Sequence, residues 1–116
     1  MNPLLIKGFY ATAAIAAYSI CSFTAGGVVT ASSASDPIAG FTNDIGADAG
    51  QIADITQIGL AEVRAGGTLT AGDAITSDAN GHAVKATAGD VIAGIAQTDA
   101  VTDDVIPVLC ALSGKV

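Results

Sequence analysis

Residues 36–40 read Asp-Pro-Ile-Ala-Gly, and residues 90–94 read Asp-Val-Ile-Ala-Gly. A shift of about 54 residues superimposes the two runs, and weaker matches continue on both sides of them. Self-similarity of this length marks a structural unit that has been duplicated. The sequence therefore predicts a single domain over residues 1–116, with repeat one at about 10–55 and repeat two at about 64–109.

The match between the repeats requires small gaps. If Ala74 is an extra residue, Ile20 lies opposite Ile75. Near the end of each repeat, Ile52 lies opposite Ile106. These matches predict which residues occupy equivalent places in the two repeats.

Turn signals divide repeat two into short segments. Gly-Gly, Gly-Asp and Asn-Gly pairs recur every 6 to 9 residues or so, and Asn80-Gly81 is a strong signal for a short hairpin. The predicted strands are 18–21, 28–31, 38–42 and 51–58 in repeat one, and 59–63, 74–76, 83–85, 91–97 and 105–111 in repeat two. Pro107 predicts an edge or a bulge in the last of these. Many short strands indicate an all-β fold, a small barrel or sandwich built from two tandem repeats of short strands, with two half-barrels closing one barrel as the simplest arrangement.

The N-terminal segment, residues 3–25, is almost uncharged and allows several interpretations. It loosely fits a secretory signal, and it fits a lipoprotein signal at Cys21 or a membrane helix poorly. Its alanines also favour a helix over 7–19. The repeat decides among these, because the counterpart of the segment lies in mid-chain at 64–79, where no signal peptide can be. We therefore expect folded strand and turn, without cleavage.

Composition and charge exclude several classes of protein. Apolar residues make up 51% of the chain, but Ala and Gly supply much of that mass, and the net charge is −7. Four scattered cations cannot form the basic patch that a nucleic-acid partner requires. Few bulky apolar residues give a thin core, so we expect a partner surface. Cys21 and Cys110 are too few for a disulfide scaffold and are predicted to be buried free thiols.

No arrangement of residues points to catalysis, a cofactor or a metal. His82 is the sole histidine, and it follows a turn. Asp73, Asp78 and Asp90 lie in glycine-rich turns, but their spacing matches no calcium motif, so turn formation is the expected role. Arg64 is the one guanidinium, expected at the surface or in an interface ion pair. The sequence predicts that the protein is not an enzyme.

Residues 63–86 read Val-Arg-Ala-Gly-Gly-Thr-Leu-Thr-Ala-Gly-Asp-Ala-Ile-Thr-Ser-Asp-Ala-Asn-Gly-His-Ala-Val-Lys-Ala. Together with Ile-Ala-Gly-Ile-Ala at 92–96 and Val-Ile-Pro-Val-Leu at 105–109, this pattern resembles the capsid cement (head decoration) proteins of tailed bacteriophages. The resemblance covers about 60–116 and reaches the first half only through the repeat. It implies a small β-rich protein, usually a homo-oligomer, that binds the outside of the expanded capsid and clamps neighbouring major capsid subunits. It implies no catalytic residues.

The expected partners are therefore the major capsid protein and further copies of the chain, as a dimer or trimer, with no nucleic acid and no membrane. Synthesis in the bacterial host cytoplasm suits free thiols, and negative charge suits the outer capsid surface of the virion. The predicted contact residues belong to an N-terminal arm at 1–9 and its neighbours: Leu4, Leu5, Ile6, Phe9, Tyr10 and Arg64. Core or oligomer packing is the alternative for these residues. Alternative functions are a tail, spike or cell-surface β module, or a small ligand-binding barrel.

Overall fold

The computed structural model describes residues 3–33, 36–42 and 45–115, with the side chains of 3–5, 7, 58 and 111–115 left out of the description. The strands of this part are β1 (Pro3–Tyr10), β2 (Ile20–Thr24), β3 (Gly27–Thr30), β4 (Ile38–Thr42), β5 (Ile52–Arg64), β6 (Ala74–Ser77), β7 (Ala83–Lys85), β8 (Val91–Ala96) and β9 (Val105–Lys115). Within these ranges no helix is long and apolar enough to cross a membrane. The predicted all-β class is confirmed, and residues 7–19 form strand and turn, as expected, in place of the helix that their alanines favour.

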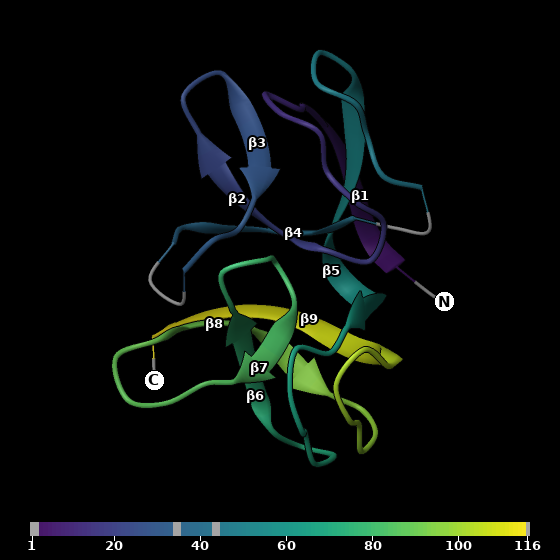
Figure 1. Ribbon diagram of the computed structural model, residues 1–116. Helices are drawn as coiled ribbons and strands as arrows, with labels where there is room; N and C mark the ends of the chain where they lie inside the picture. Colours follow the sequence, from purple (N-terminus) through teal and green to yellow (C-terminus); the bar gives the residue numbers. More distant parts are fainter. Residues whose placement is uncertain (1–2, 34–35, 43–44, 116) are drawn as a thin grey trace.

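The strands form two five-stranded antiparallel sheets that pack as a sandwich-like domain (Figure 1). Sheet one has the order β3-β2-β4-β5-β1, and sheet two has the order β5-β9-β8-β6-β7. The long strand β5 belongs to both, with its first half in sheet one and its second half in sheet two. Gly59 lies between the two halves with φ 104°, a conformation that glycine adopts without strain. The break predicted between strands 51–58 and 59–63 is thus a change of sheet within one strand.

The two sheets are built from equivalent strands, but the sequence alignment misplaced one gap. Cys21 pairs with Gly40 of β4, and Ile75 pairs with Gly94 of β8. Because the two glycines are repeat counterparts, Cys21 corresponds to Ile75. The predicted match of Ile20 with Ile75 is therefore wrong by one residue, since the extra residue lies in the β6–β7 turn.

A second correction concerns the last strand of each repeat. Phe41 pairs with Thr56, and its counterpart Ile95 pairs with Leu109. Thr56 therefore corresponds to Leu109, whereas aligning Ile52 with Ile106 would place Thr56 opposite Cys110. The predicted match for Ile52 is wrong by this single residue, because the loop between β8 and β9 is one residue shorter than the loop between β4 and β5.

Each sheet buries the same set of positions on its inner face. The core of sheet one consists of Ala11, Ile15, Cys21, Val28, Ala39, Ala47, Ala53 and Ile55. The counterparts in sheet two are all buried in its core: Ala65, Leu69, Ile75, Ala83, Ala93, Ala100, Ile106 and Val108. The duplication is therefore visible in packing as well as in topology.

The two sheets share one core where they meet. Ile20, Ile38 and Phe41 of sheet one, and Ala31 just after β3, belong to the core cluster of sheet two. Ile20 and Phe41 pair with each other on the outer face of sheet one, opposite the face of Cys21. Strand β4 contacts β8 and β9, so the outer face of sheet one packs against the inner face of sheet two. The thin core expected from composition is thus enlarged by contact between the repeats.

Pro107 lies in the interior of sheet two, which contradicts the predicted edge or bulge. It pairs with Glu62 of β5, and β8 lies on the other side of β9. The Pro107 carbonyl accepts a hydrogen bond from Gln97 N at 3.1 Å, just past the end of β8 at Ala96. Because the main-chain N and O of a strand residue point to the same side, the missing N–H of proline faces the place where β8 has already ended.

Candidate interaction surface

An apolar surface lies on the outer face of β1 and the first half of β5. Tyr10 pairs with Ile52, Gly8 with Asp54, and Ile6 with Thr56. Residues directly opposite one another and two apart share a face of an antiparallel pair. The exposed fractions are 48% for Ile6, 48% for Tyr10 and 64% for Ile52. We call Ile6, Gly8, Tyr10, Ile52 and Asp54 the β1–β5 surface.

Glycine at position 8 makes this surface possible. A Cβ placed on Gly8 would approach Ile52 Cγ2 to 2.9 Å, so a larger residue would displace the isoleucine. The phenol oxygen of Tyr10 lies 3.6 Å from the position of a Cβ on Gly50, so the ring reaches the turn that precedes β5. The result is a mostly apolar face with one carboxylate, Asp54.

The structure separates the predicted contact residues. Ile6 and Tyr10 lie together on the β1–β5 surface, but Phe9 points to the inner face, where it packs against the core of sheet one. There its ring meets Phe23 edge to face, with centroids 5.6 Å apart and planes at 79°. The side chains of Leu4 and Leu5 lie outside the described part. The N-terminal arm predicted at 1–9 is mostly strand β1, paired along β5.

Ile52 was missed by the sequence reasoning. The signal for it was available, because alternation along 51–58 places Ile52 on the same face as the charged Asp54 and opposite to Ala53. An apolar residue at the end of a strand is expected to be exposed when the next residue on the same face is charged.

Arg64 lies in sheet two, at the position equivalent to Tyr10. Its Nη1 donates a hydrogen bond to the carbonyl of Asp103 at 3.1 Å. Asp103 has φ 74°, and its counterpart in repeat one is Gly50, also at positive φ. Arg64 and Tyr10 therefore both support the turn that precedes the last strand of their repeat.

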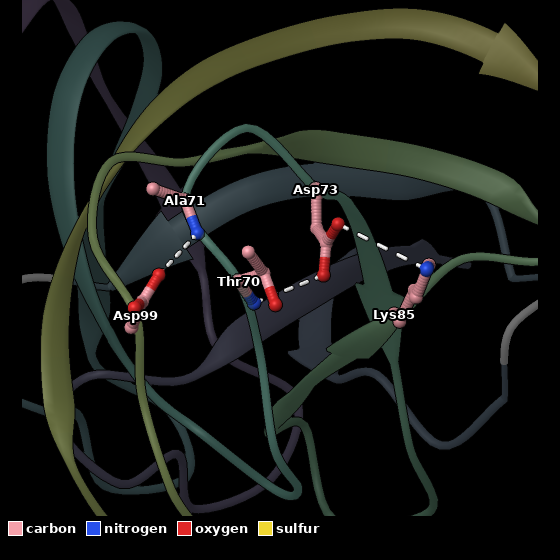
Figure 2. Close-up of polar contacts among 5 residues, drawn as sticks. All are labelled: Thr70, Ala71, Asp73, Lys85 and Asp99. Atoms are coloured by element: carbon pink, nitrogen blue, oxygen red, sulfur yellow. Dashed lines mark hydrogen bonds and ion pairs between the residues drawn. The ribbon is translucent and has the colours of Figure 1, made fainter.

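The aspartates of the glycine-rich turns stabilise backbone, as predicted. Asp73 Oδ2 accepts a hydrogen bond from Thr70 N at 3.0 Å, and Asp99 Oδ1 accepts one from Ala71 N at 2.8 Å (Figure 2). Lys85 Nζ lies 4.0 Å from Asp73 Oδ1. Asp90 repeats the pattern within its own Thr-Ala-Gly-Asp turn.

The other candidates for chemistry also have structural roles. Asp78 Oδ1 accepts hydrogen bonds from the backbone N–H of Asn80 at 2.8 Å and of His82 at 3.0 Å, closing the β6–β7 turn. Cys21 and Cys110 are free and buried, as predicted. Burial raises the pKa of each thiol to about 12, so neither is a thiolate at neutral pH. In the described part, no three His, Cys, Asp or Glu side chains gather where they could hold a metal ion.

Comparison with known proteins supports the fold. No family model and no curated protein sequence matches the chain. Among solved structures, it is similar to the head fiber gp8.5 N base of bacteriophage phi29, with a TM-score of 0.70 over 97% of both chains. The two chains are 18% identical, so the likeness is one of fold. The resemblance to the cement family remains a prediction from sequence.

Proposed function

We propose that this protein is a structural component of a phage virion that binds the outer surface of the head. The observation that best supports this is the agreement in fold over 97% of both chains with a phage head fiber base. The cement-like motifs of repeat two point to the same class of protein independently of the fold. The expected partners are the major capsid protein and further copies of the chain, and no catalytic role is expected.

The β1–β5 surface is the proposed contact with the capsid. Its large exposed side chains, Ile6, Tyr10 and Ile52, are mostly apolar, and Asp54 is its one charge, in a chain of net charge −7. Burying one such side chain contributes about 1.5–3 kcal/mol. A contact of this kind is weak for each copy but adds up when many copies bind one lattice. A protein that binds only the assembled lattice stabilises that state by mass action, which is how it would cement neighbouring subunits.

The test uses expanded phage heads that lack the protein. Wild-type protein should sediment with the heads, and the variant Ile52→Asp should bind at least ~30-fold more weakly, because an exposed isoleucine is replaced by a charge that the contact would have to bury. The control is Val101→Asp. Val101 is 59% exposed in a turn, and its counterpart in repeat one is Asp48, so the fold accepts aspartate there.

Failure of the wild-type protein to bind such heads would overturn the proposed function. Equal binding by Ile52→Asp and wild type would leave the proposed function standing but show that the β1–β5 surface is not the contact with the capsid. Circular dichroism of each variant establishes that a loss of binding is not a loss of fold.

A further inference from the structure

The outer face of sheet two is open at the positions where sheet one is covered. In sheet one, Phe41 is fully buried and Thr56 is 5% exposed. Their counterparts are Ile95, which is half-buried, and Leu109, which is 41% exposed. The difference arises because sheet two covers the outer face of sheet one, whereas no described residue covers the outer face of sheet two at Leu109.

An apolar row crosses four strands of this open face. Leu60 of β5 pairs with Leu109 of β9, which pairs with Ile95 of β8, which pairs with Ala74 of β6. We call these four residues the open face. Glu62 and Arg64 follow Leu60 on the same side of β5, and their charges are opposite. The region is therefore neutral in a chain of net charge −7, so electrostatic repulsion opposes self-contact less here than elsewhere.

The inner face of sheet one has an open edge as well. In sheet two the corresponding edge is covered: Val63 is 0% and Ser77 is 1% exposed. The positions in sheet one are occupied by Phe9, which is half-buried, and Phe23, which is 43% exposed. We call this pair of aromatic residues the phenylalanine rim.

The contact within the chain shows how an inner edge meets an outer face. The turn after Ser77 reaches sheet one, where the Gly81 carbonyl accepts a hydrogen bond from Ile20 N at 2.8 Å. A Cβ on Gly81 would lie 2.5 Å from Thr30 Cγ2, so the two surfaces are in close contact. The equivalent turn of sheet one, between β2 and β3, is exposed at 24–26.

Side-chain size is reversed between the covered and the open surfaces. Within the chain, the outer face supplies the large residues Ile20 and Phe41, and the inner edge supplies the smaller Val63 and Ser77. On the open face, the smaller Ala74 and Ile95 replace Ile20 and Phe41. On the rim, two phenylalanines replace Val63 and Ser77. At these two pairs of positions the smaller side chains of the open face leave room for the larger ones of the rim, and Leu109, which replaces Thr56, adds apolar surface to the contact.

We infer that a second copy of this chain docks head to tail, with its phenylalanine rim on the open face of the first, in the manner of the contact between the two repeats. This deepens the homo-oligomer part of the proposed function, and its test contains no phage head. The two surfaces of the contact are different, so it is heterologous. A pair of copies keeps one unused rim, on the first copy, and one unused open face, on the second, so further copies can add until a ring closes or a filament forms.

Two variants test the contact in the full chain. Phe23→Asp damages the rim and leaves the open face intact, and Leu109→Asp does the reverse. Both residues are partly exposed in the single chain, so the fold should tolerate the changes. By analytical ultracentrifugation the wild-type protein and Val101→Asp should be oligomers, and each of the two variants should dissociate at least ~30-fold more readily.

A mixture of the two variants gives the decisive result. Phe23→Asp and Leu109→Asp should each be monomeric, yet an equimolar mixture should form a dimer of one copy of each, because one undamaged rim meets one undamaged open face. If either variant fails to fold by circular dichroism, Phe23→Ser and Leu109→Thr replace them, since each introduces the residue of the other repeat at that position. A monomeric wild type, an oligomeric Phe23→Asp, or a mixture that stays monomeric would each overturn the inference.

Discussion

The shared core between the two sheets predicts very different costs for the same kind of substitution at equivalent positions. Phe41 in sheet one is fully buried between the sheets, whereas its counterpart Ile95 in sheet two is half-buried on an outer face. We expect Phe41→Ala to destabilise the protein severely and Ile95→Ala to destabilise it mildly. The comparison is matched, because both residues lie in the same place of a repeat and each pairs with a residue of the last strand of its repeat.

The magnitudes follow from burial. Truncating a buried phenylalanine to alanine costs about 3–5 kcal/mol, since both the transfer energy and the cavity contribute. Ile95 is half-buried and borders on water, so its truncation leaves an open surface hollow and about 1–2 kcal/mol is expected for Ile95→Ala. A chain of this length has a free energy of unfolding of about 6–17 kcal/mol. The first substitution thus removes a large share of the stability, and the second a small one.

Thermal unfolding followed by circular dichroism measures the difference. At about 4 °C per kcal/mol for a domain of this size, Phe41→Ala should lower Tm by about 12–20 °C and Ile95→Ala by about 4–8 °C. The protein should be dilute enough to be monomeric, because Ile95 also belongs to the open face. Equal losses of Tm at the two positions would refute the packing of sheet one against sheet two.

Three further predictions concern turns and thiols. Asp90→Ala removes two hydrogen bonds inside its turn and should lower the free energy of unfolding by about 1 kcal/mol in urea titrations; no change would show that the turn forms without its carboxylate. Gly72→Ala places a side chain at φ 92° with no atom within 4 Å of the new Cβ, so the free energy of unfolding should fall by about 1 kcal/mol from backbone conformation alone. The control Gly67→Ala, in ordinary backbone, should be neutral or stabilising. Equal effects of the two substitutions would contradict this explanation. Burial raises the pKa of Cys21 and Cys110 to about 12, so the stability they contribute is complete below pH 9 or so and is lost as pH rises toward 12; a thiol reagent at pH 8 should modify them only on unfolding, and rapid modification of the native protein would contradict the burial.

The duplication could be predicted from the sequence because the residues that are identical in the two repeats are required by local backbone geometry. Gly40 and Gly94 both lie where a Cβ would overlap the backbone of the next strand, so both repeats retain glycine in the run Ile-Ala-Gly. The hairpin at Asn80-Gly81 and the turn roles of the aspartates followed from equally local chemistry. Such features depend on a few neighbouring residues and are therefore readable from the chain.

Register and face were less predictable, because they depend on the partner strand. Aligning Ile20 with Ile75 maximised identity, yet the position equivalent to Ile75 holds Cys21. A buried thiol and an isoleucine fill similar apolar sites, so residue identity was a worse guide than strand pairing. For the candidate surface, the sequence identified Ile6 and Tyr10 but grouped them with Phe9, since only the pleat of β1 shows that the last of these faces inward.

The acidic composition has a local cause, which changes what the net charge says about function. Among the ten acidic residues in the described part of the chain, six accept hydrogen bonds from backbone N–H groups in turns and loops: Asp36, Asp73, Asp78, Asp90, Asp99 and Asp104. A fold of many short strands needs many turns, and aspartate is among the side chains that best satisfy the free donors of a turn. The value of −7 therefore reflects how the chain folds, and it does not by itself identify a partner. The surfaces proposed for contact are instead the apolar ones, where Ile52 and Leu109 face solvent.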